Sequence, residues 1–222
     1  MGCVHRSGAT NAPATVVYLQ RGDLRSWHPI TTGLHARLGG GIAQISYHRH
    51  EPGPRRTNRG NGPQYRPGPA DIDEVVAAAA GSIILVATGP MCALAQSWAA
   101  ARCRGDAQAV SGIVMLNPQS WTPGALRAGG EVGPQPRSGG TTFAAPEVAV
   151  LREIPTWVMA GAAAGATARG YASGLAASLW ADYITVPESG TAVEVSHPSR
   201  VVDTILTALD VAYRSHRYGS PT

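Results

Sequence analysis

Short apolar runs alternate with longer mixed stretches along most of the chain. Six runs rich in branched apolar residues predict buried strands at residues 15–19, 41–47, 82–87, 112–116, 155–160 and 183–186. The stretches between them predict helices at residues 28–38, 71–80, 92–103, 147–153 and 171–180. Strands that alternate with helices form right-handed βαβ units. We therefore predict an α/β fold, with a mostly parallel sheet of about six strands and helices on both faces.

Capping residues indicate where several helices begin. Asp71 with Glu74 three positions later matches a capping box. Pro29 suits the first turn of the first helix. Ser196 followed by Pro198 predicts the start of a last helix, which then carries an apolar stripe at helical spacing.

One domain accounts for most of the 222 residues, a length that buries a sizeable core. We expect this domain over residues 15–215, between disordered tails at 1–14 and 216–222. Residues 48–70 and 117–146 are dense in Pro and Gly and show no periodicity, which predicts long loops. Ligands of a parallel sheet bind outside the carboxyl ends of its strands. Both loops follow predicted strands and therefore belong to that edge.

Composition and charge narrow the classes of function. The chain is 44% hydrophobic and 14% charged, as expected for a globular protein. All 18 basic residues are Arg, and this usage, together with abundant Ala and Gly, points to a GC-rich bacterial genome. The net charge is +4, but only residues 54–67 form a cluster of Arg. Because the other Arg are scattered, we predict no nucleic-acid partner.

Cysteine spacing favours reduced thiols over a disulfide framework or a metal site. The three Cys show no metal-ligand pattern. Cys92 and Cys103 share one predicted helix and lie about 16 Å apart along it, too far for a disulfide. No apolar run reaches the roughly 18 residues of a membrane span, and no signal-peptide core is visible. We expect a cytoplasmic protein without cofactor, metal or membrane contact.

The stretch from Ser82 to Ala93 organises the chain. A buried strand breaks at Thr88-Gly89-Pro90 and continues directly into a helix. Strand, sharp turn and helix form the frame of a nucleophile elbow, in which a Ser stands clear of the turn. The nucleophile is missing from this frame.

Five segments together resemble the α/β-hydrolase family over residues 15–212. VVYLQRG is similar to its oxyanion strand, ISYHRHEPG to its Asp-x-Arg-Gly-His-Gly loop and VATGPMCA to its Val-Gly-His-Ser-Met-Gly-Gly elbow. REIPTWVMAG resembles the strand before the acid, and VPESGTAVEVSHPSRVVDTI the His loop with the last helix. The resemblance implies a minimal α/β-hydrolase fold in which residues 117–146 form a short irregular lid.

The catalytic positions of that family hold unsuitable residues in this chain. By the resemblance, the Ser position falls on Pro90, the acid on Ala164 and the His on Thr191. Pro is fixed at a φ of about −65° and does not adopt the positive φ of an elbow. Neither Ala nor Thr titrates near neutral pH, so neither relays a proton. The resemblance therefore implies a hydrolase fold without hydrolase machinery.

Other residues near the former site are candidates for a ligand pocket. They are Gln20, Arg21, Gly22, His48, Met91 and Cys92. Gly22 lets the backbone approach a ligand. Cys92 stands near a predicted helix N-terminus, where the pKa of a thiol falls.

Three functions follow from these residues. The first is a non-catalytic pseudo-hydrolase that binds a small ligand or a protein partner at the former active-site crevice. The second is a hydrolase, lyase or cyclase that uses Cys92, Arg21, His48 or His50. The third is an interaction protein that binds through the Arg-rich loop 54–67.

Overall fold

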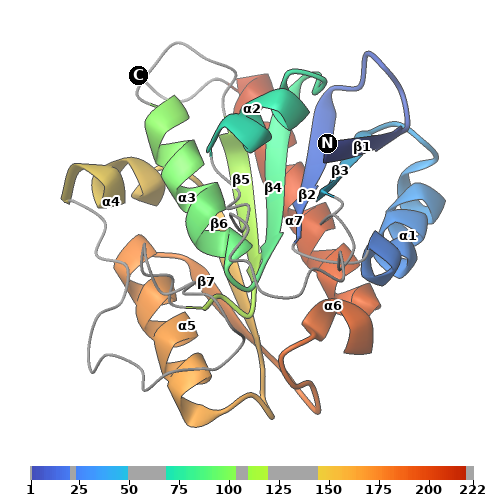
Figure 1. Ribbon diagram of the computed structural model, residues 1–222. Coiled ribbons are helices and arrows are strands. Elements are labelled where there is room, and N and C mark those ends of the chain that lie inside the picture. Colours follow the sequence, from blue (N-terminus) through green and yellow to red (C-terminus); the bar gives the residue numbers. More distant parts are fainter. Residues whose placement is uncertain (1, 21–23, 50–68, 104–109, 120–144, 219–222) are drawn as a thin grey trace, which may run out of the picture.

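A single seven-stranded sheet forms the centre of the molecule (Figure 1). The computed structural model describes residues 2–20, 24–49, 69–103, 110–119 and 145–218. The strands are β1 (Gly2–Ser7), β2 (Ala14–Leu19), β3 (Ala43–Arg49), β4 (Ser82–Thr88), β5 (Val110–Leu116), β6 (Thr156–Gly161) and β7 (Asp182–Val186). Their order is β1-β3-β2-β4-β5-β6-β7, and every neighbouring pair except β1 and β3 is parallel. The predicted α/β fold is confirmed.

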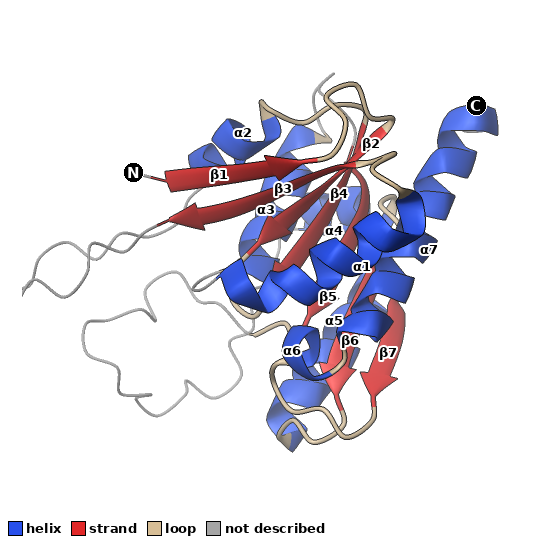
Figure 2. Cartoon of the chain, turned by 90° about the vertical axis from the view of Figure 1, so that its right-hand side faces the viewer, coloured by secondary structure: helices blue, strands red, loops and turns tan. Residues whose placement is uncertain are grey.

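Helices cover both faces of this sheet (Figure 2). They are η1 (Leu24–Trp27), α1 (His28–Leu38), α2 (Pro69–Val76), α3 (Met91–Arg102), α4 (Ala145–Arg152), α5 (Ala166–Leu179), α6 (Val193–Ser196) and α7 (Pro198–Tyr218). One face packs against α2, α3, α4 and α5, and the other against α1, α6 and α7. None of the described helices is both long enough and apolar enough to cross a membrane.

The continuous apolar run of β4 is explained by burial on both faces. Ile83 and Leu85 belong to the core beneath α3, whereas Ile84 and Val86 belong to the core beneath α7. All four side chains are fully buried. Successive side chains of a strand point to opposite faces, so a central strand needs apolar residues at every position.

The N-terminal segment differs from its prediction as a disordered tail over residues 1–14. Residues 2–7 form β1, which pairs antiparallel with β3 at the sheet edge. His5, Arg6 and Ser7 are exposed. An edge strand of this kind is held by main-chain hydrogen bonds, and its polar side chains carry no apolar alternation that would reveal it. This strand raises the number from six to seven.

Several element ends also lie outside their predicted positions. The α2 helix begins at Pro69 rather than at Asp71, α5 begins at Ala166, and α7 continues to Tyr218, past the expected end of the domain at 215. His48 was expected in a loop but belongs to β3, where its backbone pairs with that of Cys3. Helix ends and strand ends depend on tertiary contacts that the local pattern does not contain.

Candidate functional site

The turn after the central strand is sharp, and Gly89 forms its apex. Gly89 has a φ of 52°, and Pro90 has a φ of −69° and precedes α3 directly. The Gly89 N–H donates to the Leu116 carbonyl at 3.0 Å, which ties the turn to the end of β5. Because Pro excludes positive φ, the left-handed position lies one residue before Pro90. The chain thus keeps a strand–turn–helix frame, with a residue that has no side chain at its apex.

The side chain of Gln119 lies over this apex. A Cβ added at Gly89 would stand 3.7 Å from both Cδ and Nε2 of Gln119. The Gln119 backbone N–H also donates to the Gly89 carbonyl at 3.4 Å. The direction in which a nucleophile would project from the apex therefore faces a carboxamide, which is neutral and does not titrate in the physiological range.

An arginine of α5 contacts the loop after β6, in which the acid position was expected at Ala164. Ala164 is buried, and its N–H donates to the Gly161 carbonyl at 3.1 Å. The Arg169 guanidinium donates to the carbonyls of Ala162 and Ala164, the second at 3.0 Å. The loop is stabilised by these main-chain contacts, and Ala164 offers no group that could orient a base.

The loop after β7 packs tightly on the end of β6. The N–H groups of Ala162 and Ala163 donate to the carbonyls of Val186 and Ser189, each at 2.8 Å. Thr191, in the position expected for the catalytic His, is exposed. The two loops that would hold an acid and a base are therefore joined by backbone contacts instead.

A chain of hydroxyl groups ends at the one imidazole of this loop. Ser189 Oγ lies 2.7 Å from Ser196 Oγ, which lies 3.1 Å from His197 Nδ1. Ser196 also donates to the Ala192 carbonyl at 3.1 Å. A hydroxyl has one proton, so a Ser196 that donates to Ala192 accepts from both Ser189 and His197. In this arrangement His197 is a donor and does not activate Ser196 as a base would.

Two buried polar residues at this edge were not among the sequence candidates. Asn117 follows β5 with a φ of 44°, is 8% exposed and accepts from the Gly161 N–H at 3.0 Å through Oδ1. Its Nδ2 has no hydrogen-bond partner in the part of the chain that the structure describes. Oε2 of Glu194, in α6, is likewise buried and unpartnered, and burial raises the pKa of that carboxyl. In the sequence, these two residues could have been noticed only because Asn117 directly follows a predicted strand and Glu194 lies between two Val.

The other sequence candidates either lie near the ends of β2 and β4 or fall outside the described residues. Met91 and Cys92 are buried in the core beneath α3, where Cys92 Sγ donates to the Ala87 carbonyl at 3.3 Å. Gln20 accepts from the Ser26 hydroxyl at 2.9 Å. Arg21, Gly22, His50 and the Arg-rich loop 54–67 lie outside the described residues, as does most of the lid-position segment. Among the described residues, no group of His, Cys, Asp and Glu could hold a metal ion.

Cys92 is expected to resist alkylation in the folded protein. It is fully buried, and burial raises the pKa of its thiol, so the reactive thiolate is scarce. At pH 8, iodoacetamide should modify exposed Cys103 at least about 100-fold faster than Cys92, because Cys92 reacts only after local opening. Peptide mass mapping measures both rates, and urea-unfolded protein should show similar rates for the two. Fast labelling of Cys92 in folded protein would instead support the thiol-enzyme alternative.

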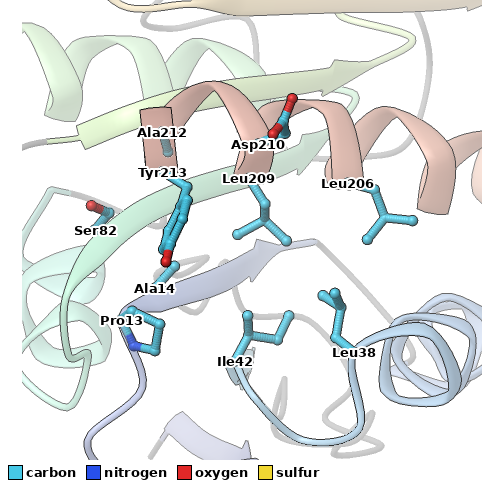
Figure 3. A pocket seen from close by; sticks show the side chains of 10 residues that line it. All are labelled: Pro13, Ala14, Leu38, Ile42, Ser82, Leu206, Leu209, Asp210, Ala212 and Tyr213. Atoms are coloured by element: carbon cyan, nitrogen blue, oxygen red, sulfur yellow. The ribbon is translucent and has the colours of Figure 1, made fainter. Parts of the chain in front are cut away.

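A pocket of about 280 Å³ lies at the opposite edge of the sheet (Figure 3). Its walls include Ala14 and Ser82, the first residues of β2 and β4, with Leu209 and Tyr213 of α7. It is thus at the amino ends of the strands, apart from the Gly89 turn. Ligands of parallel sheets are expected at the carboxyl ends instead.

Taken together, the strand order, the sharp turn after the central strand and the helix that follows define an α/β-hydrolase fold. Solved structures of that fold superpose on nearly the whole chain. A carboxylesterase from Nitrososphaera gargenis is 12% identical with a TM-score of 0.64, and the match covers 96% of each chain. A non-heme bromoperoxidase, BpoC, from Mycobacterium tuberculosis is 15% identical with a TM-score of 0.61, again covering 96% of each.

A third similar structure is named after the same fold. An alpha/beta hydrolase from Sphaerobacter thermophilus is 18% identical with a TM-score of 0.58, and the match covers 94% of this chain and 96% of that one. No family model matches the sequence, and no curated protein does so either. The shared property is therefore the fold.

Proposed function

We propose that this protein is a non-catalytic member of the α/β-hydrolase fold that binds a small ligand at the carboxyl edge of its sheet. The observation that carries the proposal is the apex of the turn: Gly89 has no side chain, and the Gln119 carboxamide lies over it. Covalent catalysis needs a nucleophile beside a base that a third group orients. Ala164 and Thr191 provide neither partner.

The burial of Cys92 counts against the thiol-enzyme alternative. Its sulfur contacts the Ala87 carbonyl beneath the turn and lies in the apolar core. A nucleophile must reach the substrate, and a fully buried thiol in apolar surroundings is inert. A small ligand is favoured over a protein partner because the unpaired groups of Asn117 and Glu194 are buried. A protein partner at the same edge remains the second candidate.

Ester hydrolysis is expected to be absent. Pure protein should hydrolyse p-nitrophenyl acetate no faster than the same concentration of urea-unfolded protein, and a serine-directed fluorophosphonate should leave its mass unchanged. The variant Gly89→Ser, which places a hydroxyl at the apex, should also stay inactive because no base accompanies it. Turnover in wild type that the fluorophosphonate abolishes would overturn the proposal.

A further inference from the structure

Asn117 is held in a conformation that Asn tolerates but does not prefer. Its φ of 44° is in the left-handed region, where a residue with a side chain is strained. One half of its amide is used, since Oδ1 accepts from the Gly161 N–H. The other half, Nδ2, is buried with no partner among the residues that the structure describes, and leaving such a donor unpaired costs about 1–3 kcal/mol. Strain together with an unsatisfied buried donor is typical of a place where a ligand binds.

The Glu194 carboxyl supplies the second unpaired group at the same edge. Its element, α6, contacts both η1 and β6. Burial is the main cause that raises the pKa of the Cys92 thiol, and the charge of Glu194 adds to it; this thiol lies near the Leu116 carbonyl. Asn117 is the next residue after Leu116. Asn117 and Glu194 therefore both lie around the end of β5.

Trp27 adds a third unpaired group on this side of the sheet. It ends η1, which α6 contacts, and it shares a core with Val193, the residue before Glu194. Its ring packs against Tyr18 with centroids 4.9 Å apart, and its Nε1 is buried without a partner. The edge thus offers two N–H donors and one carboxyl oxygen that have no hydrogen-bond partner among the described residues.

We infer that this edge binds a small neutral molecule that carries both a hydrogen-bond acceptor and a donor, as an amide group does. The acceptor pairs with Asn117 Nδ2, and Trp27 Nε1 offers a second N–H for it; the donor pairs with Glu194 Oε2. An anion would meet the like charge of Glu194, and a cation would meet the N–H groups of Asn117 and Trp27, so each is disfavoured. The inference rests on the proposed binding function and names its class of ligand.

Three small planar molecules of nearly equal size separate these possibilities. Acetamide is neutral, acetate is an anion and acetamidinium is a cation. Nitrogen-labelled protein at pH 8 is titrated with each, and the NMR signals of the Asn117 side-chain amide and the Trp27 indole N–H are followed. Acetamide should shift both signals saturably in the millimolar range, and the other two should bind at least about tenfold more weakly, equivalent to about 1.4 kcal/mol.

Matched variants test the part played by Glu194. Glu194→Gln keeps the shape but removes the charge, so acetate should then bind at least about tenfold more tightly than it does to wild type. Glu153→Gln removes an exposed carboxylate that follows α4, on the other face of the sheet, and should leave all three affinities unchanged. The amide spectrum of each variant verifies the fold.

Two results would overturn the inference. One is that none of the three molecules shifts the Asn117 and Trp27 NMR signals, which would mean that water alone satisfies the buried groups. The other is acetate or acetamidinium binding as tightly as acetamide in wild type. Neither result bears on ester turnover, and turnover would refute the proposed function without changing these affinities.

Discussion

Gly161→Ala is expected to lower the free energy of unfolding by about 3 kcal/mol, at the upper end of what overpacking costs. Gly161 ends β6 and is buried. A Cβ at this position would overlap the carbonyl oxygens of Gly190 and Ser189 and would lie 2.7 Å from the Ser189 carbonyl carbon. All three atoms belong to the main chain, so no side-chain rotation relieves the overlap.

The loop that causes this overlap has little freedom to retreat. The Ser189 carbonyl accepts from the Ala163 N–H, and the carbonyl of Val186, the last residue of β7, accepts from the Ala162 N–H, each at 2.8 Å. Moving residues 189–190 away would break the bond from Ala163, and the bond from Ala162 to Val186 holds the start of the loop in place. The expected loss therefore combines a steric overlap with hydrogen bonds that oppose its relief.

Urea unfolding followed by circular dichroism measures this loss, and Gly174→Ala is the matched control. Gly174 lies inside α5, is exposed, and nothing stands within 4 Å of the position its Cβ would take. The same substitution there should stabilise the protein by about 0.5–1 kcal/mol, because Ala favours a helix over Gly. If both variants shifted the urea midpoint in the same direction, the close approach of Gly161 to residues 189–190 would be contradicted.

Much of the fold could be predicted because the central strands are buried on both faces. The uninterrupted apolar run of β4 and the apolar stripe of α7 reflect burial directly, so local patterns were sufficient. The strand β1 could not be predicted from such patterns, since its short sequence has no apolar alternation and it joins the sheet through its pairing with β3. To predict β1, one must know which main-chain N–H and C=O groups of β3 are left unpaired at the sheet edge.

The candidate site could be predicted only in part. Pro90 excluded a positive φ at its own position, and that physical rule agrees with the observed angle of −69°. The rule did not predict where the apex of the turn lies. A Gly before the Pro lets the positive φ move one residue back, to Gly89. Asn117 and Glu194 were missed for a different reason. Their interest lies in buried atoms without partners, a property that depends on segments far apart in the sequence.

Asn117→Ala is expected to destabilise the protein by about 1–3 kcal/mol. The variant loses the oxygen that accepts from the Gly161 N–H, which leaves a buried donor unpaired at a cost of about 1–3 kcal/mol. Part of this cost is offset because the variant also removes the Asn117 Nδ2 donor, which is unpaired among the described residues of the wild type. Ala also tolerates the φ of 44° less well than Asn, whose short polar side chain can bond locally, and left-handed backbone costs about 1–2 kcal/mol. Thermal and urea unfolding measure the sum of both effects.

Asn117→Gly separates the two contributions. Gly also lacks the acceptor, but it adopts positive φ freely, so this variant should be more stable than Asn117→Ala by about 1 kcal/mol. The control is Gln119→Ala, which removes an exposed amide at the same edge and keeps the backbone bond to Gly89, so it should change stability by less than about 0.5 kcal/mol. Equal stability of Asn117→Ala and Asn117→Gly would mean that the backbone at this residue is not strained. If the Asn117 variants lost less stability than Gln119→Ala, the bond from Gly161 would not hold the ends of β5 and β6 together. The expected order is therefore Gln119→Ala, then Asn117→Gly, then Asn117→Ala, from most to least stable, because each step adds one physical cost to the one before it.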